Sequence, residues 1–354
     1  MGRVWKHAIV GGGVVGEWHA RVLRDLPSTE LVAVCDIDVP KATKHLEKNN
    51  LAHVPIFSDL RQMLDKCDAE VIHICTPSGD HLDPALLSMD AGRHVICEKP
   101  IEITPERVDV MIDRASKRNV KLAGIFQNRW NRANAAIKKA ADDGKFGRIT
   151  YGGCHTPWFR TDQYYRDGGW RGTWKLDGGG AIMNQSVHAV DLIQWIVGPI
   201  KQVSAYASSL IHPEIEVEDT LVASVQFESG AYGVIMGATS MWPGSSVRIE
   251  VGGAKGTAVS ENSLKFWRFQ DESEQASTEQ IERVNGATRF ETTGGGSNPL
   301  DVPTQMHMDN VSAILEAWES GSEAPTHGPE ARKAVAIIKA LYDSAKKGGV
   351  PVRV

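Results

Sequence analysis

Three adjacent residues, Glu98, Lys99 and Pro100, place a carboxylate and an amine directly before a proline. The apolar run 95–97 in front of them predicts a short buried strand that delivers both polar side chains at its end. A residue that precedes proline is restricted to extended conformations, so Lys99 is held more firmly than a lysine on a helix surface. Desolvation in a dry cleft would lower its pKa towards the range useful for proton transfer. The alternative is a solvated lysine at the end of a strand.

A second group of polar residues lies in the apolar segment after the glycine run 178–180. Asn184, His188 and Asp191 have the spacing i, i+4 and i+7, which predicts one shared face of a helix that begins near residue 181. The glycines indicate close approach of the backbone to a ligand. Two alternatives are a buried histidine with satisfied hydrogen bonds, or polar residues that cap neighbouring loops. A zinc site lacks two further ligands, so no metal is expected.

The N-terminal segment carries Gly11, Gly13 and Gly16 in the pattern GxGxxG, between an apolar strand-like run and a helix expected over 17–26. Gly11 is expected to form the tight turn, Gly13 to admit a pyrophosphate and Gly16 to allow close packing of helix on strand. The helix N-terminus then faces the phosphates, with Val14 and Val15 in its first turn. This context predicts a dinucleotide-binding turn.

The cofactor predicted by this segment is NAD rather than NADP. Asp36 directly follows the next expected strand, 31–35, and lies 20 positions after Gly16. A carboxylate at this point accepts hydrogen bonds from the adenosine ribose and repels a 2′-phosphate. The next residue is Ile37 rather than an arginine that would bind that phosphate.

Strand and helix patterns alternate as far as residue 126, which predicts a doubly wound parallel sheet over 1–126. The expected helices are 39–49, 58–66 with Ser58 as its N-cap, 81–91 and 104–118, and the expected strands include 71–75, 95–97 and 121–126. Ligands bind at the carboxyl ends of such strands. Further cofactor contacts are therefore expected from Thr76, Pro77, His81, Glu98, Lys99 and Asn128.

The second half, 127–354, is predicted to be an α+β domain for substrate binding and oligomerisation. Several stretches between 149 and 268 alternate apolar and polar residues, as in an open-faced, mostly antiparallel sheet. Apolar residues such as Val234, Ile235 and Met236 are expected on its outer face, which predicts a homodimer or homotetramer. The polar segment 269–300 is expected to be exposed. The closing helices, 306–320 and 329–347, are candidates to pack on the first domain.

The order of these motifs resembles the glucose-fructose oxidoreductase, inositol dehydrogenase and MocA-like family, over nearly the whole chain. The resemblance implies a Rossmann domain, an open-faced sheet domain, and hydride transfer between a nicotinamide and a hydroxyl-bearing carbon. It implies that Lys99 assists proton transfer, that His188 acts at the substrate hydroxyl, and that Glu98 lies near the nicotinamide. Many relatives carry Asp where this chain has Asn184, so Lys99 is expected to carry most of the proton transfer.

The substrate class implied by the resemblance is a sugar, a polyol or a nucleotide sugar. The pattern WRGTW, GGG and NQ followed by His188 is similar to the branch that oxidises UDP-N-acetyl-hexosaminuronates. Aromatic faces and guanidinium groups for such a substrate are expected from Arg160, Tyr164, Tyr165, Trp170 and Arg171, together with Lys99, Asn184 and His188. Two other functions stay open: an NAD-binding regulator without catalysis, which typically lacks the lysine, and an NAD-dependent glycosidase with transient oxidation.

Composition limits the classes of function that the chain can have. The chain has 354 residues, enough for two domains, and a net charge of −5 gives no basic surface for nucleic acid or an anionic membrane. The five cysteines show no CxxC spacing, so neither a disulfide framework nor a structural zinc site is expected. No signal peptide and no apolar run of transmembrane length stand out, so a cytoplasmic enzyme is expected.

Overall fold

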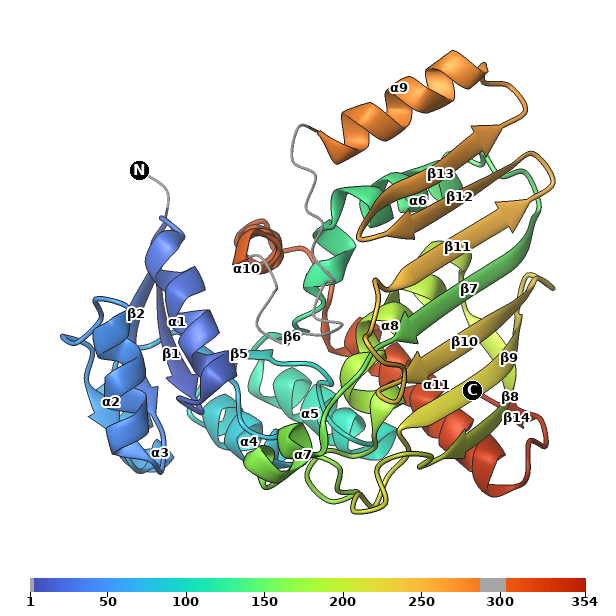
Figure 1. Cartoon of the computed structure of the whole chain (residues 1–354). Helices are drawn as coiled ribbons and strands as arrows, with labels where there is room; N and C mark the ends of the chain where they lie inside the picture. The colour runs from blue at the N-terminus through green and yellow to red at the C-terminus, as the bar shows by residue number, and fades with distance from the viewer. Residues whose placement is uncertain (1–2, 287–303) are drawn as a thin grey trace. The chain divides into compact units, whose positions relative to one another are not determined.

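The computed structural model describes residues 3–286 and 304–354, which form two compact units (Figure 1). The first unit comprises Met1–Gln127 and Pro303–Arg332, and the second comprises Asn128–Val302 and Lys333–Val354. One boundary therefore follows Gln127, and another falls within the long helix α11, Gly328–Lys346. Each unit has its own sheet.

The first unit is built on a six-stranded parallel sheet with the order β3-β2-β1-β4-β5-β6. Its strands are β1 (Trp5–Val10), β2 (Thr29–Cys35), β3 (Ile56–Phe57), β4 (Val71–Ile74), β5 (His94–Cys97) and β6 (Leu122–Gly124). All four residues of β4 are buried, as expected for a parallel strand covered on both faces. The predicted doubly wound sheet is confirmed.

Five helices connect these strands: α1 (Val14–Asp25), α2 (Val39–Lys48), α3 (Leu60–Lys66), α4 (Leu82–Asp90) and α5 (Pro105–Arg118). Thr104 caps α5 as predicted, because its side chain accepts a hydrogen bond from the backbone of Arg107. The prediction of Ser58 as the cap of α3 is wrong. Asp59 takes that role and accepts from the backbone of Gln62, since a carboxylate one residue later reaches the free amides of the first turn.

Helix α10 (Thr304–Glu319) belongs to the first unit. Its buried residues Ile314 and Trp318 share a hydrophobic cluster with Trp5 of β1 and Val71 of β4. The backbone N–H of Phe126, just after β6, donates a hydrogen bond of 2.8 Å to Asn310 Oδ1. The chain thus returns after residue 303 to complete the core of its first unit.

The second unit contains an eight-stranded sheet with the order β13-β12-β11-β7-β10-β9-β8-β14. Its strands are β7 (Ile149–Pro157), β8 (Ile200–Ser208), β9 (Thr220–Phe227), β10 (Tyr232–Ala238), β11 (Arg248–Gly253), β12 (Gly256–Glu261), β13 (Ser263–Phe269) and β14 (Val352–Arg353). Only β7 and β10 pair in parallel; the other pairs of this sheet are antiparallel. The predicted mostly antiparallel sheet is confirmed.

One face of this sheet is covered by α6 (Arg132–Asp142) and α8 (Val187–Val197), which Figure 1 shows on the same side. Within the polar segment 269–300, residues Glu274–Asn285 form the largely exposed helix α9, and residues 287–303 lie outside the described part. In the described ranges, 3–286 and 304–354, no helix combines the length and the apolar character needed to cross a membrane.

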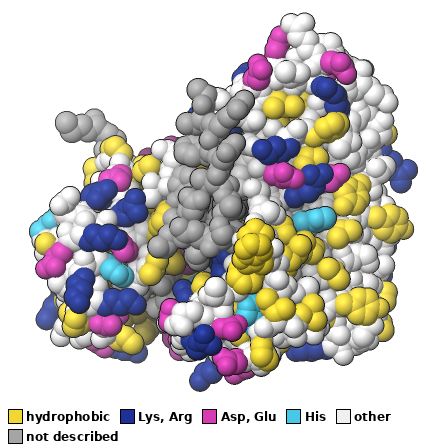
Figure 2. Space-filling model, viewed as in Figure 1, with side chains coloured by type: hydrophobic (Ala, Val, Ile, Leu, Met, Phe, Trp, Pro, Cys, Tyr) yellow, Lys and Arg dark blue, Asp and Glu magenta, His cyan; other side chains and the backbone are white. Residues whose placement is uncertain are grey.

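The opposite face of the sheet is open and carries hydrophobic side chains among charged ones (Figure 2). Tyr206 and Tyr232 are 65% and 64% exposed. The prediction that Val234, Ile235 and Met236 all lie on this face is wrong for Ile235. Successive strand residues point to opposite faces, so Ile235 is fully buried under the helices while its two neighbours are partly exposed.

Candidate active site

The turn between β1 and α1 is shaped by its glycines. Gly11 has a φ of +96°, and a Cβ there would lie 2.6 Å from the carbonyl oxygen of Cys75. A Cβ on Gly16 would lie 1.9 Å from the carbonyl oxygen of Gly11. By contrast, a Cβ on Gly13 would meet no atom of the described protein within 4 Å, and Gly13 gives α1 no side-chain cap. The helix N-terminus is therefore open to an anion, as a pyrophosphate site requires.

Asp36 lies directly after β2 and is tied to this turn. Its Oδ2 accepts a hydrogen bond from the backbone N–H of Gly12, and its Oδ1 accepts one of 2.7 Å from the backbone N–H of Asp38. The side chain of Ile37 is 95% exposed. The carboxylate is therefore fixed beside the glycine turn, where the residues fit an adenosine ribose.

This arrangement predicts that NAD(H) binds more tightly than NADP(H). We expect a difference of about tenfold or more in Kd, because a hydrogen bond to a charged group contributes roughly 1.5–3 kcal/mol. Asp36→Ala should reduce the preference, whereas Glu30→Ala on the same strand, β2, should leave it unchanged. Titration of both cofactors against intrinsic fluorescence measures the ratio. Equal or reversed affinities in the unmodified protein would contradict the role of Asp36.

His81 connects the turns that follow β4 and β5. It is 1% exposed, its Nδ1 lies 3.0 Å from the carbonyl oxygen of Pro100, and its Nε2 lies 2.9 Å from that of Thr76. Thr76 Oγ1 in turn donates to the carbonyl oxygen of Asp80 over 3.0 Å. The cofactor contact expected of His81 stays a prediction; both of its ring nitrogens face backbone carbonyl oxygens of this unit. Its role here is to hold two loops at the carboxyl edge of the sheet.

Strand β5 delivers Glu98 and Lys99 at its end. Glu98 is 7% exposed; its Oε2 accepts a hydrogen bond of 3.0 Å from the backbone N–H of Lys99, and its Oε1 lies 2.8 Å from His19 Nε2. Burial opposes the charge of Glu98, but His19 outweighs burial and holds the pKa of Glu98 well below its usual range. Lys99 is partly exposed beside this ionised carboxylate.

In the second unit, the predicted single helix after residue 181 is wrong. Residues Ala181–Gln185 form a turn of π-helix, and α8 begins only at Val187. Asn184 therefore lies in a turn of a different type from α8, the helix that carries His188 and Asp191. The i, i+4 and i+7 spacing predicts a shared face only for a regular α-helix.

Two of these three polar residues have clear partners within the unit. Asn184 Nδ2 donates a hydrogen bond of 2.7 Å to Asp177 Oδ1. Asp191 is buried and accepts two hydrogen bonds from Arg129, of 2.7 Å from Nε and 2.5 Å from Nη2. His188, partly exposed at the start of α8, is the member of the group best placed to meet a ligand.

The glycine run before the π-turn packs against protein. A Cβ on Gly180 would lie 1.7 Å from the carbonyl oxygen of Glu218, and one on Gly179 would lie 2.0 Å from the hydroxyl of Tyr342. Glu218 accepts hydrogen bonds from the backbone of Gly180 and Ile182. Burial raises the pKa of Glu218 to about 7. Gly179 and Gly180 are therefore required by packing on the distant Glu218 and Tyr342, which the sequence did not single out. Close approach of a ligand to this glycine run stays a prediction.

Two arginines predicted to bind substrate lie against the ring of Tyr164. The guanidinium of Arg171 lies 4.2 Å from the centroid of that ring, and the guanidinium of Arg160 lies 5.2 Å from it. Arg171 also lies 5.6 Å from the ring of Trp170. Arg160 is 5% exposed, whereas Tyr164, Trp170 and Arg171 are partly exposed and give one region of the second unit a cationic and aromatic surface. Such a surface suits an acidic, ring-shaped ligand.

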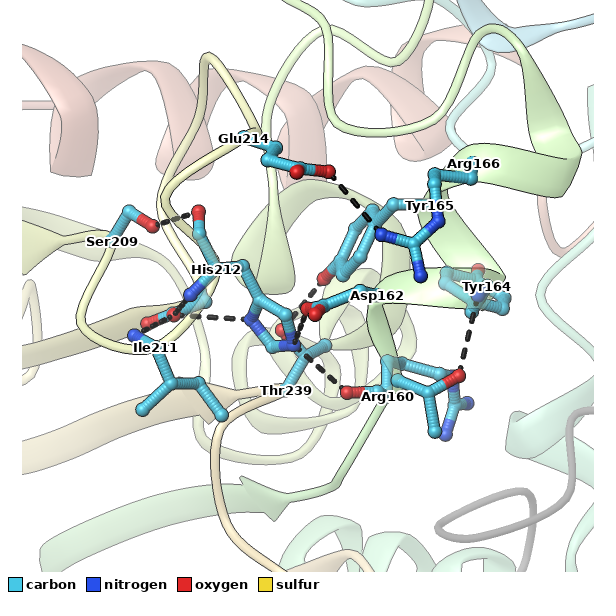
Figure 3. Close-up of polar contacts among 12 residues, drawn as sticks. Arg160, Asp162, Tyr164, Tyr165, Arg166, Ser209, Ile211, His212, Glu214 and Thr239 are labelled. Carbon is cyan, nitrogen blue, oxygen red and sulfur yellow. Dashed lines mark hydrogen bonds and ion pairs between the residues drawn. The ribbon is translucent and has the colours of Figure 1, made fainter.

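Tyr165 lies inside this region rather than on its surface. It is 7% exposed, and its hydroxyl is 2.7 Å from Thr239 Oγ1. Figure 3 shows its ring beside His212, whose Nε2 lies 2.8 Å from the carbonyl oxygen of Arg160. The loop around His212 was not predicted from the sequence, and it supports the segment that carries Arg160.

Two further expectations concern Asn128 and metal binding. Asn128 lies in a short 3-10 helix, Gln127–Trp130, and its carbonyl oxygen accepts a hydrogen bond of 3.0 Å from Asn134 Nδ2. Within residues 3–286 and 304–354, no group of three or more His, Cys, Asp or Glu side chains is placed to hold a metal ion.

Comparisons with known proteins identify the family of this chain. A model described as the oxidoreductase family with an NAD-binding Rossmann fold matches residues 5–126, and the GFO/IDH/MocA C-terminal domain matches 134–259. The WlbA dehydrogenase of Bordetella pertussis, solved with NADH and UDP-GlcNAcA, is 31% identical with a TM-score of 0.87, covering 99% of this chain and 98% of that one. Myo-inositol 2-dehydrogenase of Thermotoga maritima is 28% identical over 72% of this chain and 74% of its own length. Inositol 2-dehydrogenase of Rhizobium meliloti is 25% identical over 96% of each.

The Rossmann sheet, the glycine turn and these matches define an NAD-binding oxidoreductase. More closely, the chain belongs to the GFO/IDH/MocA family. The family resemblance predicted from the sequence motifs is therefore confirmed, as are the fold class and NAD as the cofactor.

Proposed function

We propose that this enzyme uses NAD to oxidise a hydroxyl group of a pyranose, and that its substrate is an acidic nucleotide sugar. The observation that carries the proposal is the similarity along the whole chain to a dehydrogenase solved with NADH and UDP-GlcNAcA. The partly exposed guanidinium group of Arg171, against Tyr164, supports an anionic substrate. Sugars without a carboxylate or phosphate are expected to react poorly.

Oxidation of an alcohol removes a hydride from carbon and a proton from oxygen, and bound NAD supplies the hydride acceptor. We assign the proton to Lys99, whose neutral amine would take it from the hydroxyl. Glu98 fixes the backbone of Lys99 through the hydrogen bond to its N–H. We assign His188 a hydrogen bond to the substrate, and the pair Asn184–Asp177 the task of fixing the turn that precedes it.

A panel of sugars, polyols, sugar acids and nucleotide sugars tests the proposal, with NADH formation followed by absorbance. We expect the highest kcat/KM for an acidic nucleotide sugar and a lower value for its uncharged counterpart. A higher kcat/KM for a free polyol would overturn the substrate class. Substrate breakdown without net NADH would identify the glycosidase mechanism, and binding of NAD without turnover of any compound would favour a regulator.

We also propose a homodimer or homotetramer formed through the open sheet face. The exposed aromatic residues Tyr206 and Tyr232 support this, because contact of large hydrophobic side chains with water is energetically unfavourable. Light scattering at micromolar concentration should therefore give an oligomer. Val222→Lys, opposite Tyr206 in the sheet, should shift it towards monomer, whereas Glu279→Lys on the exposed helix α9 should not. A monomeric unmodified protein would count against the proposal.

We also propose that the enzyme is located in the cytoplasm. All five cysteines lie in the described part of the chain and are free thiols, as in reducing compartments. The net charge of −5 supports the expectation that neither nucleic acid nor a membrane surface is a partner.

A further inference from the structure

Three buried histidine side chains form a row on one face of the parallel sheet in the first unit, and the row ends at Glu98. His7 Nδ1 on β1 lies 2.9 Å from His73 Nε2 on β4, and His73 Nδ1 lies 2.8 Å from His19 Nδ1 on α1. His19 Nε2 lies 2.8 Å from Glu98 Oε1. None of the three histidines is more than 2% exposed. The proposed reaction uses none of them, yet the row ends beside Lys99.

The fold explains why these side chains meet. His7 and Ile9 point to the same face of β1, and His73 lies opposite Ile9 in the parallel register. Helix α1 packs on this face and contributes His19 from its buried side. Three elements of the first unit, β1, β4 and α1, therefore each supply one imidazole.

The chemistry of imidazole restricts how protons can be placed along this row. Each nitrogen–nitrogen contact needs one donor and one acceptor, and a neutral ring has one of each. If all rings are neutral, His7 donates from Nδ1 to His73, His73 donates from Nδ1 to His19, and His19 donates to Glu98. One additional proton reverses both nitrogen–nitrogen contacts. His19 is then an imidazolium that donates to His73 and Glu98, and His73 and His7 carry their protons on Nε2.

We propose that His7, His73 and His19 form a relay that holds one excess proton at His19, and that this charge beside Glu98 sets the proton affinity of Lys99. His19 is thus a positioning residue for the proposed reaction. His7 Nε2, at the far end, is buried and makes no hydrogen bond with any residue in the described ranges. In the protonated row this nitrogen carries the proton of His7.

The surroundings favour a single charge, located on His19. Burial opposes it, and Glu98 favours it by its charge and by its hydrogen bond, since Glu98 Oε1 lies 2.8 Å from His19 Nε2. Burial also raises the pKa of the Cys75 thiol, so the thiol is neutral and Glu98 supplies the negative charge. Burial lowers the pKa of His7 to about 3 and that of His73 well below its ordinary value, and the charge on His19 adds to both shifts.

The remaining groups that face Glu98 do not replace His19. His307 on α10 lies 4.0 Å from Glu98 Oε1, but burial lowers the pKa of His307 to about 4 and keeps it neutral. Burial likewise lowers the pKa of His81, whose ring nitrogens are directed at the carbonyl oxygens of Pro100 and Thr76, and it raises that of the Cys97 thiol, which is neutral. The buried carboxylate of Glu102 is already paired with Arg107 at 2.7 Å. Lys99 is then the group whose charge responds to the His19–Glu98 pair.

The consequence for Lys99, which rests on the proposed function, follows from the sign of the charges. The carboxylate of Glu98 favours protonated lysine, and the imidazolium of His19 opposes this effect. Removing the charge of His19 should therefore keep Lys99 protonated to higher pH. A base must be neutral to accept a proton, so the acid limb of kcat/KM should move upwards.

The relay itself is tested without substrate or cofactor, by NMR of the ring nitrogens in the full chain labelled with 15N-histidine. We expect a signal with both nitrogens protonated at pH 8 that belongs to His19, so this signal should vanish in His19→Gln. His53→Gln, an exposed histidine of the same unit, should leave that signal unchanged. The absence of an imidazolium at pH 8, or its survival in His19→Gln, would overturn the proposal.

A second variant tests transmission along the row. His7→Leu removes the acceptor of the His73 Nε2 proton, although it does not touch His19. Both states of the row lose their hydrogen bond to His7, but the protonated row loses the stronger one, because the charge on His19 polarises it. The pH at which His19 loses its charge should therefore fall by about one unit or more. An unchanged titration in a folded His7→Leu protein would refute the relay and leave three separate buried histidines.

The pH dependence of kcat/KM tests this inference separately from the proposed function. In His19→Gln, the acid limb of kcat/KM should shift upwards by about one pH unit relative to the unmodified enzyme, while His53→Gln leaves it in place. An unshifted limb, in an enzyme that Lys99→Ala inactivates, would overturn the link between the relay and Lys99. If Lys99→Ala stays active, the proposed role of Lys99 fails, and the NMR result still decides whether the relay exists.

Discussion

Lys99→Ala is expected to lower kcat by about two to four orders of magnitude, the usual contribution of a positioned acid–base group. The variant removes the amine that we assign to the substrate proton. It leaves the backbone N–H of residue 99, and with it the hydrogen bond to Glu98, in place. The Kd of NAD should change little, because Asp36 and the glycine turn supply most of that binding. Steady-state kinetics on a validated substrate and a fluorescence titration of NAD measure the two quantities.

Lys121→Ala is the matched control for this experiment. Lys121 lies just before β6 of the same sheet, and its amine is 3.8 Å from the exposed carboxylate of Glu323, a contact of small energetic value. Its kcat should stay within about twofold of that of the unmodified enzyme. Near-normal turnover in Lys99→Ala, with folding verified by circular dichroism, would remove Lys99 as the base. His188 would then become the leading candidate.

The parts of the site that could be predicted from the sequence are those whose chemistry is local. Gly11 and Gly16 are needed because atoms within their own strand–turn–helix unit, or at the end of the adjacent strand, leave no room for a Cβ. Glu98 and Lys99 follow a run of buried strand residues, so their place at the carboxyl edge follows from the pattern. In both cases the local sequence pattern determines where the residue lies in the fold.

The parts that could not be predicted depend on partners far away in the chain. His19 and Glu98 are 79 residues apart, and the isolated histidines of β1 and β4 resemble ordinary strand residues. Gly180 is required by the backbone of Glu218, which no local pattern distinguishes from a ligand. The turn at 181–185 was misread because hydrophobic spacing assumes a constant rotation per residue, and a π-turn breaks it.

The pair Arg129–Asp191 leads to the largest expected effect on stability. Both side chains are at most 4% exposed, the contact is bidentate, and the Arg129 guanidinium also lies 5.2 Å from the ring of Trp195. Asp191→Leu would leave the buried guanidinium without its carboxylate. We therefore expect α8 to lose about 3–5 kcal/mol of stability, the usual cost of breaking a buried ion pair from one side.

Native-state hydrogen exchange of the α8 amides measures this loss locally, which suits a chain of two units better than one global transition. Asp142→Ala is the control, because its ion pair with Lys138 is on the surface and should contribute less than about 1 kcal/mol. Adding Arg129→Met to Asp191→Leu should restore most of the lost stability, since no uncompensated charge then remains buried. If Asp191→Leu alone costs less than about 1 kcal/mol, the pair does not hold α8. The position of His188 would then have to depend on the contacts of the π-turn with Glu218 and Asp177.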